Sequence, residues 1–309
     1  MTVQARLHGL KRSALTMFGL RAAAESARGN LPSLLMGAEK AAAAVRLGEH
    51  AQRRTGNGEK FWQFREYMPS DRPQDIDWRQ SGRGDRVFVR QKEWQTTQTG
   101  LIWCQRNDGM HYASRTILQT KHEAAATISL ALAILMTGAG ELVGTLDGSL
   151  RPGKSEATLQ SLGEKLLEPD IAEIPHALNH EPPRHATIIL AGDFLAPLDQ
   201  TEHAVHALAD RTDNILLVQI LDPAEMNLPF RGRVIFEHGD GAIRHHITNV
   251  DSVRESYQQK INAHIEGLKA MCHHHGWHYA QHITDQDAAT TVLGLWQTIA
   301  MKYKNGGIL

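Results

Sequence analysis

The chain contains few cysteines and no long apolar run. Its 309 residues include only two cysteines, Cys104 and Cys272, too few for the disulfide framework of a small secreted protein. The longest apolar run, ISLALAILM at 128–136, is far shorter than the roughly 20 residues that span a bilayer. Residues 1–28 mix charged side chains among alanines and leucines, so they lack the continuous apolar core of a signal peptide. We therefore expect a cytoplasmic protein with no membrane span.

The motifs of common catalytic sites are also missing. No Gly-x-Ser-x-Gly, paired-cysteine or His-Glu-x-x-His motif occurs, and GNGEK at 56–60 lacks the spacing of a phosphate-binding loop. The histidines at 273–275 adjoin Cys272, but consecutive helical residues point about 100° apart, so at most one or two of them could share a zinc centre. They are better explained as exposed residues at the C-terminus of a helix. We expect no enzyme, no cofactor and no bound metal.

The net charge of −1 conceals an uneven distribution. Residues 1–94 hold 17 lysines and arginines against 10 acids, whereas residues 95–309 hold 16 against 24. Either the two parts attract each other across a domain contact, or the first part offers a basic surface to an acidic partner or to nucleic acid. No nucleic-acid-binding motif accompanies the basic residues, so we expect no nucleic-acid partner.

Apolar runs that alternate with helical patterns predict the fold. We expect strands at 100–104, 141–148, 186–192, 214–222 and 277–283, and helices at 120–138 and about 154–167, 201–211, 251–275 and 286–303. The turn residues at 239–241 suggest a hairpin between 234–237 and 242–247. Strands that are apolar on both faces belong in a mostly parallel sheet covered by helices on each side. Residues 97–309 therefore predict a doubly wound α/β domain.

The first third of the chain is organised differently. Residues 10–28 and 33–47 read as helices separated by Gly29, Asn30 and Pro32, so we expect a helical segment over 1–48. Residues 49–96 turn to alternating and aromatic patterns, as in RVFVRQKEW, and predict a smaller strand-rich module. Within it, arginines recur beside acids and aromatic rings from 53 to 90, a composition that favours bidentate ion pairs and stacking.

This arginine-rich segment carries a family resemblance. The run FREYMPSDRPQDIDWRQSGR, together with LVQILDPAEMNLPFRGRVIFE at 217–237 and GWHYAQHITDQ at 276–286, resembles the bacterial DUF58 family over roughly residues 45–300. The signature residues are Arg65, Glu66, Tyr67, Asp71, Asp75, Asp77, Trp78 and Arg83. They are expected either to form a docking face or to hold the module to the α/β domain.

The resemblance implies a von Willebrand factor A-like domain with a metal-ion-dependent adhesion site. In such domains the loop after the first strand carries Asp-x-Ser-x-Ser, whose oxygens suit Mg²⁺. Aligned on Met110, this chain has Gln105, Asn107 and Gly109 at the three ligand positions, so the motif is degenerate. Parallel strands end on one rim, and AGDF at 191–194 matches the strand-end aspartate of the family and puts Asp193 there.

Two interpretations of this rim remain open. Asn107, Asp108 and Asp193 could form a weakened metal site, or Asp193 could instead cap the loop or helix that follows it. We favour the second interpretation.

Two functions follow from the resemblance and the rim. DUF58 proteins are commonly partners of MoxR-type AAA+ ATPases, which implies a non-enzymatic adaptor in protein assembly or maturation. The alternative is an enzyme or small-ligand binder at the rim around Asp193, which would need a pocket with convergent polar groups. The sequence leaves the oligomeric state open.

Overall fold

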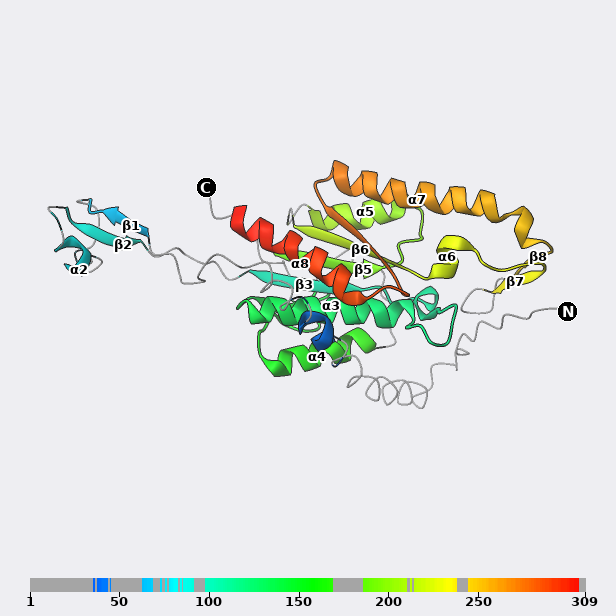
Figure 1. Cartoon of the computed structure of the whole chain (residues 1–309), viewed down its shortest axis with the longest axis horizontal. Coiled ribbons are helices and arrows are strands. Elements are labelled where there is room, and N and C mark those ends of the chain that lie inside the picture. Colours follow the sequence, from blue (N-terminus) through cyan, green and yellow to red (C-terminus); the bar gives the residue numbers. More distant parts are fainter. Residues whose placement is uncertain are drawn as a thin grey trace. The chain divides into compact units, whose positions relative to one another are not determined.

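The fold is described from a computed structural model of the chain (Figure 1). The structure describes residues 98–168, 186–209, 214–237 and 244–305, Thr212, and shorter stretches between 36 and 45 and between 63 and 91. The chain divides into two compact units, one of residues 49–97 and the other of residues 1–48 and 98–309. The helix expected at 10–28 lies outside the described residues.

The larger unit is built on a five-stranded parallel sheet. Its strands are β3 (Thr99–Cys104), β4 (Leu142–Thr145), β5 (Thr187–Gly192), β6 (Ile215–Leu221) and β9 (His278–Ile283). They lie in the order β4-β3-β5-β6-β9, and every neighbouring pair is parallel. The predicted α/β fold and all five predicted strands are confirmed. Beside β4, Val143 and Gly153 form a single antiparallel bridge.

Helices cover both faces of this sheet (Figure 1). They are α3 (Lys121–Gly138), α4 (Glu156–Leu167), α5 (Leu198–Ala209), α6 (Pro223–Asn227), α7 (Arg254–His274) and α8 (Ala288–Asn305), with short 3-10 helices η2 (Asp108–His111) and η3 (Val250–Ser252). The five longer helices match the predicted ones to within a few residues. The short helices α6, η2 and η3 were not predicted.

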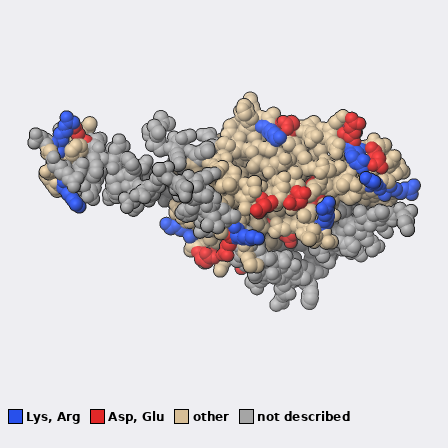
Figure 2. Space-filling view, in the orientation of Figure 1, with Lys and Arg blue, Asp and Glu red and all other residues tan. Residues whose placement is uncertain are grey.

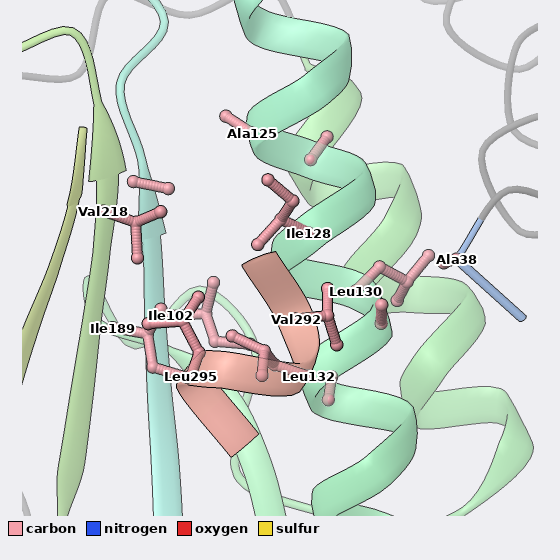
Figure 3. Close-up of a cluster of buried hydrophobic side chains, with 14 of the residues drawn as sticks. Ala38, Ile102, Ala125, Ile128, Leu130, Leu132, Ile189, Val218, Val292 and Leu295 are labelled. Atoms are coloured by element: carbon pink, nitrogen blue, oxygen red, sulfur yellow. The ribbon is translucent and has the colours of Figure 1, made fainter. Parts of the chain in front are cut away.

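Alternating side chains of the strands fill two separate cores. Ile102 and Ile189 point to the face covered by α3, α4 and α8, whereas their neighbours Leu101 and Ile188 point to the face covered by α5 and α7. Figure 3 shows the first core, in which Ile102, Ile189 and Val218 of the sheet face Ile128 and Leu132 of α3. A strand buried on both faces must be apolar at every position, which explains the continuous apolar runs of the sequence.

The central helix α3 is enclosed on nearly all sides. Thr120 and Glu123 form a capping box at its N-terminus, which satisfies backbone N–H groups that have no partner within the helix. Part of its outer surface is covered by helical residues near the N-terminus of the chain, where Ala38, Ala41, Ala42 and Val45 are buried at the spacing of one helical face. These residues belong to the helix expected at 33–47. Figure 3 shows Ala38 beside Leu130.

Two hairpins complete the described residues. In the smaller unit, β1 (Gln63–Glu66) pairs antiparallel with β2 (Phe88–Gln91), and the short helix α2 (Trp78–Ser81) adjoins them through a hydrogen bond from Phe88 N to Ser81 Oγ of 2.9 Å. In the larger unit, β7 (Val234–Glu237) pairs with β8 (Arg244–Ile247), as predicted. This second hairpin rests on a small apolar cluster around Leu228, Val234 and Val250.

On the face of the larger unit shown in Figure 2, acidic and basic side chains are interspersed, with no extended patch of one sign. Among the residues described, no helix combines the length and the apolar character that a bilayer crossing requires.

Candidate functional site

The strand order places a candidate site at one end of the sheet. The chain runs from β3 outward to β4 on one side and then returns to β5 on the other, so the carboxyl ends of β3 and β5 flank the point where the topology reverses. Ligands of open parallel sheets bind at such switch points. We use the term switch-point rim for the loops that follow β3 and β5, residues 105–120 and 193–197, together with α6 after β6.

The loop after β3 uses its polar side chains to hold backbone. The Oε1 atom of Gln105 accepts hydrogen bonds from the backbone N–H groups of Asp193 at 2.9 Å and of Phe194 at 3.4 Å. The Oδ1 atom of Asn107 accepts one from Met110 N at 3.1 Å and caps η2. At two of the three positions aligned with metal ligands, the side-chain oxygen therefore already accepts a hydrogen bond from a backbone N–H group.

The third aligned position, Gly109, lies close to the other oxygens of the rim. A Cβ atom at Gly109 would be 3.4 Å from both Asn107 Oδ1 and Asp193 Oδ2. A hydroxyl-bearing residue here would bring a third oxygen to the same point, and glycine does not supply one. Asp108 is the first residue of η2, and a negative charge at this end of a helix is stabilising.

The loop after β5 is held from three sides. Its backbone N–H groups donate to Gln105, as described above. The Asp193 carbonyl accepts a hydrogen bond from Gln219 Nε2 at 3.0 Å, and the Phe194 carbonyl lies 2.7 Å from His264 Nε2. Phe194 has a φ of 48°, a left-handed conformation that costs a non-glycine residue on the order of 1–3 kcal/mol. Asp193 Oδ1 accepts the N–H of Leu195 at 3.3 Å, the loop-capping role that we favoured for Asp193.

A buried lysine joins this loop to α6. The Nζ atom of Lys121 donates to Asp193 Oδ2 at 2.9 Å and to Glu225 Oε1 at 2.6 Å, and the lysine side chain is only 1% exposed. The other oxygen of Glu225 accepts Asp222 N at 2.9 Å within the capping box of α6. The Asp222 carboxylate accepts the backbone N–H groups of Ser114 and Ala224, so the loops after β3 and β6 are connected as well.

Lys121 and Glu225 were not predicted as site residues from the sequence. The available signals were a lysine at the first position of a helix, where a cation opposes the helix dipole, and the DPAE run directly after a buried strand. Neither signal indicates that the two residues meet, because 104 positions separate them in the chain.

Burial and charge act in opposite directions on the Lys121 ammonium. Burial lowers its pKa, but the attraction of Asp193 and Glu225 and their hydrogen bonds outweigh that effect, so the pKa lies above its ordinary value. Burial raises the pKa of the Glu225 carboxyl, against the lowering effect of Lys121, and the nearby Asp193 carboxylate raises it further. The two carboxyl groups therefore share one ammonium in a buried place.

The residues of the rim do not fit a divalent cation. An ion at the two carboxylates would need the volume that the Lys121 ammonium occupies, and it would sit against a like charge. The described residues include no group of three or more histidine, cysteine, aspartate or glutamate side chains arranged to hold a metal. This arrangement does not support the weakened metal site of Asn107, Asp108 and Asp193, the interpretation that we did not favour.

Three further reactive side chains of the larger unit, Cys104, Cys272 and His122, lie in the core. Burial raises the pKa of both thiols, Cys104 and Cys272, to about 11, which disfavours the nucleophilic thiolate. Burial lowers the pKa of His122 to about 4, and its Nε2 lies 2.7 Å from the Leu166 carbonyl. A small hollow beside the end of β3, lined in part by Arg106, Asp147 and Lys165, has room for about one water molecule.

The histidines near the end of α7 form a ring cluster on the described surface. His275 stacks on Trp277 with ring centroids 4.5 Å apart, and its Nε2 lies 2.8 Å from Glu202 Oε1. His206 meets the same imidazole edge to face at 5.5 Å. His273 and His274 are exposed, as predicted, whereas His275 is half-buried by these contacts.

The structure describes part of the family signature. Glu66 ends β1 and accepts a hydrogen bond from Arg86 at 2.5 Å, while Tyr67 N donates to the Val87 carbonyl. The Arg65 backbone pairs with Val89 across the hairpin, and Trp78, which is 70% exposed, begins α2. Asp71, Asp75, Asp77 and Arg83 lie outside the described residues.

Comparison with known proteins identifies one family. The family described as "Protein of unknown function DUF58" matches residues 63–267, more than half of the chain. The matched segment contains the hairpin of the smaller unit and the sheet from β3 to β6, and thus the whole switch-point rim. Searches of curated proteins and of solved structures each found no match.

Proposed function

The chain belongs to the DUF58 family, and from this premise we propose that it is a non-enzymatic adaptor whose partner is a MoxR-type AAA+ ATPase in the cytoplasm. We also propose that the larger unit is a von Willebrand factor A-like domain with a degenerate metal-ion-dependent adhesion site. The reversal of strand order at β3 and the antiparallel bridge of Val143 with Gly153 at the sheet edge support that assignment. The proposed domains are 1–48, 49–96 and 97–309.

One observation carries the proposal: the polar side chains of the rim are occupied in fixing its shape. Gln105, Asn107 and Asp193 each bond to backbone of the rim loops, and Asp193 also pairs with Lys121. A general acid or base needs a side chain that reaches a substrate, whereas a docking face needs only a fixed surface. An enzyme built around Asp193 would have to break its ion pair first. The geometry thus favours recognition over catalysis.

The rim also carries two exposed apolar side chains that could contact a partner. Ile117 lies in the loop between η2 and α3 and is 88% exposed, and Leu195 in the loop after β5 is 39% exposed. Their loops are held by the bonds of Ser114 N to Asp222 and of Gln105 to the loop after β5. Fixed loops lose little conformational entropy on binding, so they suit a docking surface.

A pull-down tests the proposal. Tagged wild-type protein, incubated with native cytoplasmic extract with and without ATP, is expected to retain an AAA+ ATPase identified by mass spectrometry. Ile117→Asp is expected to reduce retention at least about tenfold, because a carboxylate would lose its hydration at a central apolar contact.

The matched control is Ile235→Asp, which changes an exposed isoleucine of the β7–β8 hairpin. It is expected to retain the ATPase like wild type. Absence of any ATPase under both nucleotide conditions would contradict the adaptor role. Equal loss in both variants would contradict the placement of the docking surface on the rim. Alanine variants of Arg65, Asp71 and Asp75 test the alternative docking face in the family signature.

A further inference from the structure

Lys121 occupies an unusual position for a lysine. It is the first residue of α3, where the partial positive charge of the helix N-terminus disfavours a cation, and its side chain is almost completely buried. Removing an ammonium group from water costs several kcal/mol unless charged partners compensate for it. A lysine in this setting therefore depends on the carboxylates of Asp193 and Glu225.

The two carboxylates come from different parts of the rim. Asp193 follows β5 and Glu225 belongs to α6 after β6, whereas Lys121 starts the helix that follows the β3 loop. One ammonium at 2.9 Å from Asp193 and 2.6 Å from Glu225 thus links all three segments. Carboxylates that converge from separate loops onto one small cation are the arrangement of a divalent-ion site. Here the cation is covalently part of the chain.

We propose that the Lys121 ammonium is the permanent cation of the switch-point rim, held where a divalent ion would otherwise neutralise the strand-end carboxylates. The rim then keeps its shape at any divalent-ion concentration, and the surface it offers to a partner does not depend on metal. The inference rests on the contacts of Lys121 alone and holds whichever molecule docks on the rim.

The proposal predicts a latent ion site that appears when the ammonium is removed. Lys121→Ala would leave Asp193 and Glu225 facing an emptied volume with no positive charge. The thermal midpoint is expected to fall by about 10 °C, because buried carboxylates would remain unpaired. Millimolar Ca²⁺ or Mg²⁺ is expected to restore at least half of this loss, since an ion that binds only the folded state raises its stability.

Three matched controls define the result. Wild type is expected to show no change in midpoint with Ca²⁺ or Mg²⁺ beyond that given by KCl of equal ionic strength. Lys121→Met, which fills the volume without a charge, is expected to be destabilised and to gain nothing from divalent ions. Lys121→Ala combined with Asp193→Asn is expected to lose the response to divalent ions, because one of the two carboxylates is gone.

A neutralised variant keeps the proposal testable if Lys121→Ala does not fold. Lys121→Met with Asp193→Asn and Glu225→Gln removes all three charges together and is expected to fold, with a midpoint above that of Lys121→Met. The proposal would be overturned by a wild-type midpoint that rises with divalent ions, by a Lys121→Ala variant as stable as wild type, or by a folded Lys121→Ala that responds to divalent ions no more than to KCl. A neutralised variant no more stable than Lys121→Met would do the same.

Discussion

At the scale of single residues, the switch-point rim relies on buried polar side chains that are paired with one another or with the backbone. Gln219 is fully buried, yet its amide donates to the Asp193 carbonyl and accepts from the Tyr279 hydroxyl at 2.6 Å. Lys121 is paired with two carboxylates in the same region. Removing one partner from such a network leaves the other without compensation, which costs more than the bond itself contributes. The rim is therefore sensitive to single substitutions.

A pH prediction belongs to this scale. Burial, with a contribution from the neighbouring His111 and Arg106, lowers the pKa of His122 to about 4 in the folded protein. Because this pKa lies below that of the unfolded chain, the neutral imidazole contributes stability above pH 6.5, and the contribution is lost as the pH falls towards 4. Wild type is therefore expected to lose about 2 kcal/mol between pH 7 and pH 5 that His122→Gln does not lose.

Urea unfolding at the two pH values measures this difference. His246→Gln on β8 serves as the control, since this side chain is exposed, and it is expected to show the same pH dependence as wild type. A His122→Gln variant with the full wild-type pH dependence would refute the assignment of His122 as a buried neutral histidine.

At the scale of helices and strands, periodicity predicted long elements well and short ones poorly. The apolar run NILLVQILD correctly predicted β6 at Ile215–Leu221, and the helical pattern ending at Gly138 correctly predicted α3. The five-residue helix α6 was missed because a capping box and a proline at its start are too short a signal against the surrounding loop. The helix α6 and its N-cap supply Glu225 and Asp222 to the rim, so this missed element matters for the site.

An element-scale prediction concerns the helical residues near the N-terminus. Ala42 is completely buried against the core around α3, whereas the adjacent Ala43 is exposed. Ala42→Asp would bury an unpaired carboxylate and is expected to lower the free energy of unfolding by at least about 3 kcal/mol. Ala43→Asp introduces the same side chain at an exposed position and is expected to lower the free energy of unfolding by less than about 1 kcal/mol. Chemical denaturation followed by circular dichroism measures both, and equal effects would show that this helix does not pack against α3.

At the scale of the whole molecule, the sequence predicted the sheet but not the chemistry at its end. The alternation of strands and helices yields a parallel sheet, and Asp193 could be assigned to the rim from the end of its strand. The residues Gln105, Asn107 and Gly109 predicted a degenerate metal site, which stays a prediction, and they gave no indication of Lys121. Lys121 and Glu225 meet only because α3 and α6 begin at the same end of the sheet, which local patterns do not encode. The family signature in the smaller unit stays a prediction.

In the proposed rim, the Lys121 ammonium takes the place of a metal ion between the carboxylates of Asp193 and Glu225. Crystals of the wild-type protein soaked in millimolar MnCl₂ test this claim most directly, because anomalous scattering locates manganese independently of the phases. We predict no anomalous peak at the switch-point rim, with the Lys121 ammonium within hydrogen-bonding distance of both Asp193 and Glu225. A manganese ion coordinated by Asp193, with the lysine side chain displaced from the two carboxylates, would contradict the account.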